Sequence, residues 1–172
     1  WNLVGAGVFG FLINPPIALY YMQGLNTTSV HAHTALFGVY GMLGIGLTLF
    51  CLKGLSAQRA WRTGTLAFAF WAINIGLALM VLLSDLPRGL LQVWASVNEG
   101  MWMARSAEFM QSDLMHTLRW MRAIGDTVFA TGILALAWFV LGLKTGWSLH
   151  AERDVVPTES CPDAAHAAPL KS

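Results

Sequence analysis

The sequence has few charged residues and almost no cysteine. Asp, Glu, Lys and Arg make up only 11% of its 172 residues, whereas soluble domains carry about 25%. This shortage of charge excludes an ordinary soluble domain. Cys51 and Cys161 lie far apart, without the spacing of metal ligands, so we expect no structural disulfide and no cysteine metal site. The sequence also lacks a run of basic residues, which excludes nucleic acid as a partner.

Long apolar segments are what the sequence has instead, with 56% of the residues hydrophobic. A bilayer core about 30 Å thick requires about 20 apolar residues per helix, and four segments meet this length. The sequence therefore predicts an all-α, multi-pass membrane helix bundle. The predicted transmembrane helices are residues 3–22, 29–52, 60–83 and 124–143. Pro15 and Pro16 remove two backbone donors from the first of these, which predicts a kink near Asn14.

The rest of the chain is more polar. Residues 85–122 contain several tryptophans, and we expect an interfacial segment with short helices along the membrane surface. Residues 148–172 show no apolar period and predict a flexible polar tail after a membrane part of residues 1–147. The chain starts at Trp1, inside an apolar segment and without an initiator methionine. We therefore expect it to be the C-terminal piece of a longer protein.

The loop between the second and third predicted helices indicates the orientation in the membrane. It contains Lys53, Arg59 and Arg62 and no acidic residue. Short loops rich in basic residues stay on the cytoplasmic side. This places the start of the second helix near the outer face.

Two histidines, His31 and His33, lie near the start of that second helix. A helix turns about 100° per residue, so positions i and i+2 point to nearly opposite sides. Such a pair is poorly placed to bind one ion together, but each imidazole can bind a different metal centre, which suits two haems flanking one helix. Alternatively, one ring reaches the headgroups and the other hydrogen-bonds a neighbouring helix. Ionisable groups within a membrane are costly and usually functional, which favours the haem interpretation.

Small and polar residues within the predicted helices support helix contacts or cofactor contacts. Asn74 lies in the middle of the third helix, and we expect it to hydrogen-bond a neighbouring helix. Glycines leave one flank of the second helix without side chains, a flank that fits either a neighbouring helix or a flat macrocycle. These glycines are Gly38, Gly41, Gly44 and Gly46.

Four stretches of the sequence resemble one family. Residues 30–43, which contain both histidines, are similar to the tenth helix of nitric oxide reductases of the haem–copper oxidase superfamily. Residues 5–15 resemble the helix before it, and residues 102–109 and 118–127 resemble the region around the last two helices. The resemblance covers residues 1–146 and is strongest to the single-chain, quinol-dependent type.

The resemblance implies a fold and a set of roles. The chain would form the C-terminal part of a bundle of twelve or more helices in the bacterial plasma membrane, in contact with lipid. His31 would bind the high-spin haem b3, and His33 would bind the low-spin haem b. Asp126 would line a quinol pocket, although an ordinary interfacial salt bridge is the simpler interpretation of this residue.

The same resemblance implies an activity of the intact protein. Two molecules of nitric oxide would be reduced to nitrous oxide and water, with electrons from quinol or from cytochrome c through a partner subunit. The ligands of a non-haem iron and of calcium would lie on the missing N-terminal helices, so this chain would be inactive alone. Three other functions stay open: an oxygen-reducing haem–copper oxidase, a non-catalytic haem module for electron transfer, and a transporter without cofactor.

Overall fold

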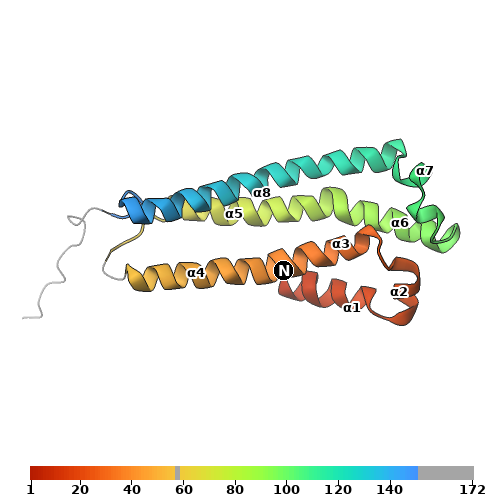
Figure 1. Cartoon of the computed structure of the whole chain (residues 1–172), viewed down its shortest axis with the longest axis horizontal. Helices are drawn as coiled ribbons and strands as arrows, with labels where there is room; N and C mark the ends of the chain where they lie inside the picture. Colours follow the sequence, from red (N-terminus) through yellow and green to blue (C-terminus); the bar gives the residue numbers. More distant parts are fainter. Residues whose placement is uncertain (57–58, 151–172) are drawn as a thin grey trace, which may run out of the picture.

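The computed structural model describes residues 1–56 and 59–150, and this part of the chain is a bundle of long helices (Figure 1). Its only extended pairing is an isolated antiparallel bridge between Trp61 and Leu149. The predicted all-α fold is therefore confirmed. Most of the predicted polar tail, with Cys161, lies outside the described residues.

The first span is sharply bent. It consists of η1 (Asn2–Val8), α1 (Phe9–Ile13) and α2 (Pro16–Met22), and the axis turns by 92° between α1 and α2. Pro15 adopts an extended conformation, with φ −55° and ψ 141°, because two consecutive prolines cannot continue the helical hydrogen bonding. The predicted kink is confirmed, and α2 lies across the end of the bundle (Figure 1).

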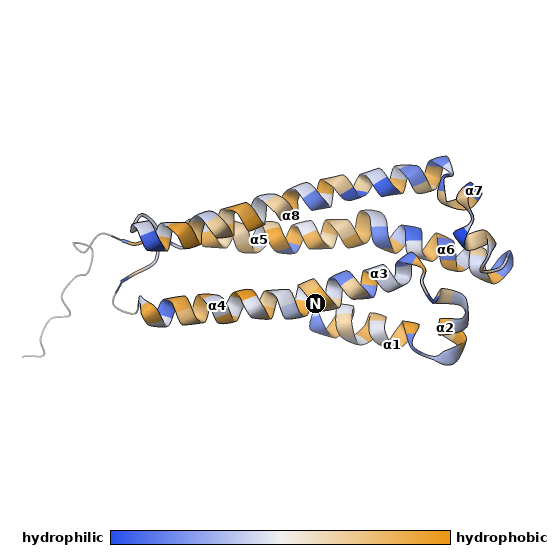
Figure 2. Cartoon of the chain, viewed as in Figure 1, coloured by the Kyte–Doolittle hydropathy of each residue, from blue (hydrophilic) through white to orange (hydrophobic). Residues whose placement is uncertain are grey.

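The second span is continuous from Asn26 to Leu55. It comprises α3 (Asn26–Ala32), η2 (His33–Gly41) and α4 (Met42–Leu55), of which η2 has the wider turns of a π-helix. Both histidines lie where α3 passes into η2. No residue of α4 is buried, and Figure 2 shows how apolar this helix is over its whole length.

The third and fourth spans are longer than their apolar segments. α5 (Gly64–Met80), η3 (Val81–Asp85) and α6 (Leu86–Asn98) form one helix of 35 residues, and α8 (Asp113–Thr145) contains 33. The short η4 (Met103–Arg105) and α7 (Ala107–Met110) connect them. At about 1.5 Å per residue each long helix exceeds the thickness of the hydrocarbon core. The predicted interfacial segment thus consists mostly of helix ends that extend beyond the apolar spans.

Pro87 explains why the third span continues past residue 83. It lies at the first turn of α6, after the π-helical turns of η3. A proline in a first turn removes a donor that has no partner in the helix, so the helix continues in nearly the same direction. Figure 1 shows α6 following α5 as one rod.

Glycines allow α5 and α8 to pack backbone to backbone. A Cβ atom added to Gly76 would lie 2.5 Å from the backbone nitrogen of Phe129, and one added to Gly125 would lie 2.5 Å from that of Met80. Gly132 approaches Ile73 in the same way. Small residues permit close approach of membrane helices, and this contact anchors the C-terminal half of the chain.

The chain turns back after α8. Gly146 adopts a left-handed conformation with φ 95° and ends the helix. Ser148 and Leu149 are buried, and the Ser148 hydroxyl donates a hydrogen bond to the carbonyl oxygen of Phe139. The ordered chain therefore extends past Trp147, where the membrane part was predicted to end.

Candidate haem-ligand site

His31 faces the first span. Its Nδ1 lies 3.0 Å from the carbonyl oxygen of Gly5 in η1. The ring also fills the space above Gly10, where an added Cβ atom would lie 2.9 Å from the imidazole Cε1. The glycines of the first span thus make room for this imidazole.

His33 faces the opposite part of the bundle. Its Nδ1 lies 2.9 Å from the carbonyl oxygen of Ser29 and 3.3 Å from Asp85 Oδ2, at the end of η3. Its Nε2 accepts a hydrogen bond from Arg122 Nη2 on α8, at 3.3 Å. The two rings therefore contact different helices, as the i, i+2 spacing predicts.

The hydrogen bonds assign the same tautomer to both rings. In each ring Nδ1 faces a backbone carbonyl oxygen, which accepts but cannot donate, so the proton lies on Nδ1. The lone pair then lies on Nε2. A neutral imidazole whose other nitrogen donates to a carbonyl is the usual form of a metal-binding histidine. The donor set thus fits axial ligation of haem iron by Nε2.

Charged residues converge beside His33 but not beside His31. Arg122 lies between two carboxylates: its Nη1 is 3.6 Å from Asp85 Oδ1, and its Nε is 3.2 Å from Asp126 Oδ2. The Asp126 side chain is 48% exposed, whereas that of Asp85 is 1% exposed. The structure therefore brings Asp126 into the His33 cluster through Arg122, as part of a surface salt bridge.

Asp85 was missed as a site residue by the sequence analysis. It lies just after a long apolar run, in a stretch that was assigned to a polar interfacial segment. A carboxylate directly at the end of such a run is the signal that indicates burial. Only the continuation of the helix through Pro87 places it against His33.

Several buried polar atoms in this region have no hydrogen-bond partner among the described residues. They are Thr27 Oγ1, Ser84 Oγ, both carboxylate oxygens of Asp85, and Arg88 Nε. Within residues 1–56 and 59–150, no three histidine, cysteine, aspartate or glutamate side chains are grouped so as to hold a metal ion. The described residues thus offer single axial ligands but no complete site for non-haem iron or calcium.

The glycine flank of the second span is only partly open. The Trp1 ring fills the space beside Gly38, where an added Cβ atom would lie 2.8 Å from Trp1 Cγ. The same indole donates a hydrogen bond of 2.8 Å to Asn74 Oδ1, which confirms the predicted interhelical role of Asn74. Gly44 and Gly46 have no atom within 4 Å of an added Cβ.

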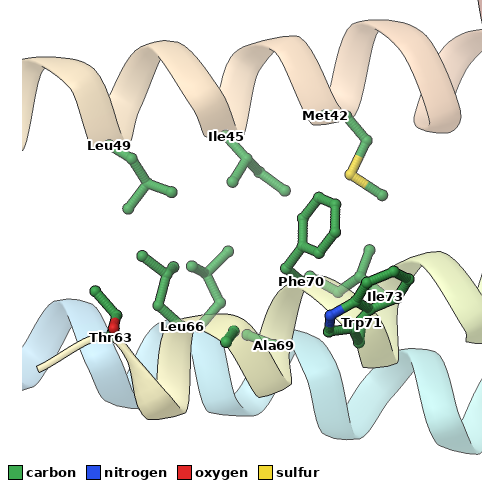
Figure 3. Close-up of a pocket in the computed structure, with 11 residues that line it drawn as sticks. Met42, Ile45, Leu49, Thr63, Leu66, Ala69, Phe70, Trp71 and Ile73 are labelled. Atoms are coloured by element: carbon green, nitrogen blue, oxygen red, sulfur yellow. The ribbon is translucent and has the colours of Figure 1, made fainter.

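An apolar cavity of about 350 Å³ lies between α4 and α5 (Figure 3). Met42, Ile45 and Leu49 of α4 face Leu66 and Phe70 of α5 across it. Its lining residues include no charged side chain to orient a ligand. The cavity therefore adds no candidate reactive group to the histidine site.

Two comparisons place these observations among known proteins. Residues 1–128 match the family described as cytochrome c and quinol oxidase polypeptide I. Over 136 residues the chain is 27% identical to a nitric oxide reductase of Stutzerimonas stutzeri, an alignment that covers 76% of this chain. The chain spans only 28% of the length of that relative.

Proposed function

Because this chain belongs to the cytochrome c and quinol oxidase polypeptide I family, the haem–copper oxidases, we propose that it is part of a membrane-bound nitric oxide reductase. The membership confirms the predicted superfamily, the helix-bundle fold and the location as an integral membrane protein. The proposed reaction of the longer protein converts two molecules of nitric oxide, two electrons and two protons into nitrous oxide and water. The name of the similar protein in Stutzerimonas stutzeri supports this substrate.

The observation that carries the proposal is the pair of imidazoles that diverge from one helix. His31 would hold haem b3 and His33 would hold haem b, each through Nε2. The Gly5 and Ser29 carbonyls fix the proton on Nδ1 and orient each ring. Arg122 lies 3.3 Å from His33 Nε2, so its flexible, partly exposed side chain must move away before that nitrogen binds iron.

When bound, the two haems supply electron transfer and redox chemistry that amino-acid side chains cannot provide. The chain's own contribution is position. Two axial nitrogens on one rigid helix, two residues apart, fix the relation between the two centres. The apolar surroundings of both rings exclude bulk water from the reacting side.

Asp126 is proposed to line the quinol pocket. Its carboxylate is half exposed and paired with Arg122, which places an acceptor of a hydroxyl proton near His33. Asp126→Asn is expected to raise KM for quinol and to leave turnover with an artificial one-electron donor unchanged. An unchanged KM would remove Asp126 from the pocket and favour cytochrome c as the donor.

Haem content tests the proposal. The full-length protein is expected to contain two b-type haems per chain, by pyridine haemochrome assay. His31→Ala and His33→Ala should each retain one. His116→Ala is the matched control, because His116 is exposed and contacts only Trp120 on its own helix. Unchanged haem content in both histidine variants would refute the proposal.

The substrate requires its own measurement. The purified full-length protein, supplied with reductant, should convert nitric oxide into nitrous oxide in a ratio of two to one, measured by gas chromatography. Rapid oxygen consumption without nitrous oxide formation would instead identify an oxygen-reducing oxidase of the same family.

A further inference from the structure

Asp85 is a buried carboxylate in the bundle that makes no hydrogen bond among the described residues. It lies at the end of η3, and its side chain is 1% exposed. A buried ionised group is costly unless it is paired and hydrogen-bonded. An ordinary structural ion pair would satisfy these oxygens, so the position of Asp85 requires another explanation.

The groups around the carboxylate come from three elements. His33 Nδ1, on the second span, lies 3.3 Å from Oδ2, and Arg122 Nη1, on α8, lies 3.6 Å from Oδ1. Arg88 follows one turn later on the same helix, and Arg119 lies one turn before Arg122. The carboxylate thus lies between an imidazole and a guanidinium, with more positive charge nearby.

The Nδ1–H of His33 has two acceptors within reach. The carbonyl oxygen of Ser29 lies 2.9 Å away and belongs to the same helix, whereas Asp85 Oδ2 reaches the proton from a neighbouring helix. A carboxylate that accepts this proton from a metal-bound histidine fixes the ring orientation and makes the imidazole a stronger electron donor.

We propose that Asp85 is the positioning residue of His33 and lowers the reduction potential of the haem that His33 binds. This inference rests on the proposed function, because it requires His33 to be an axial ligand. One electron converts Fe(III) into Fe(II) and lowers the charge of the haem by one. A negative charge buried near the iron therefore favours the oxidised form, and it does so strongly where little water screens it.

A redox titration of the low-spin haem in the full-length enzyme, at one pH, tests the inference. Asp85→Asn keeps the shape of the side chain and removes its charge. The ratio of reduced to oxidised low-spin haem at a fixed potential should rise at least tenfold, which is about 59 mV for a one-electron couple. Asp126→Asn is the matched control, because Asp126 also pairs with Arg122 but does not touch His33; its ratio should change less than threefold.

Equal shifts in the two variants, or no shift in Asp85→Asn, would overturn the inference. If Asp85→Asn does not assemble, Asp85→Glu retains the charge and should keep the ratio within threefold of the parent protein. A tenfold rise in an assembled Asp85→Glu enzyme would also overturn it. His33→Ala separates the two proposals: an unchanged low-spin spectrum refutes the proposed function itself. Loss of that spectrum, together with an unshifted Asp85→Asn, refutes only the role of Asp85.

Discussion

Replacing Gly76 by alanine tests the close packing of α5 on α8. The added Cβ atom would lie 2.5 Å from the backbone nitrogen of Phe129 and 2.7 Å from its Cα, whereas ordinary contacts begin at 3.4 Å. The two helices must therefore separate locally by up to 0.9 Å, the difference between these limits. Backbone atoms cannot move aside as a flexible side chain does, and such overpacking costs about 1–3 kcal/mol.

The matched control for this variant is Gly54→Ala. Gly54 lies in α4, and no atom is within 4 Å of an added Cβ. Both variants gain the higher helix propensity of alanine, about 1 kcal/mol, so the difference between them isolates the clash. Unfolding of the full-length protein by SDS titration should show Gly76→Ala less stable than Gly54→Ala by about 1–3 kcal/mol. Equal stability would refute the backbone contact between α5 and α8.

Two further substitutions test the polar contacts between helices. Arg122→Gln leaves buried Asp85 without its nearest cation and should destabilise the protein by about 3–5 kcal/mol, whereas exposed Arg119→Gln should change it by less than about 0.5 kcal/mol; equal effects in the same titration would contradict the buried pair. Asn74→Leu removes the acceptor of the Trp1 indole and should cost about 0.5–1.5 kcal/mol, and an unchanged midpoint would show that this hydrogen bond contributes nothing.

Much of the architecture follows from local features of the sequence. The double proline after Asn14 dictates the bend of the first span, because neither ring nitrogen can donate a hydrogen bond. The divergence of His31 and His33 follows from helical geometry alone, and the structure assigns each ring to a different neighbouring helix. Asn74 in an apolar helix required a partner, and it has one.

The limits of the helices could not be predicted in the same way. Hydropathy detects the part of a helix that fits the hydrocarbon core, but α8 begins at Asp113, well before its apolar stretch. Asp85 and Pro87 resemble a helix end in the sequence, although the helix continues through them. Contact between Asp85 and His33 depends on how three spans pack, so it is a property of the tertiary structure.

The central claim is that His31 and His33 hold two different haems of opposite spin state. Magnetic circular dichroism of the oxidised full-length protein distinguishes high-spin from low-spin haem. His33→Ala is predicted to lose the low-spin bands and keep the high-spin bands, and His31→Ala is predicted to do the reverse. Loss of the same bands in both variants, or of none in either, would contradict the account.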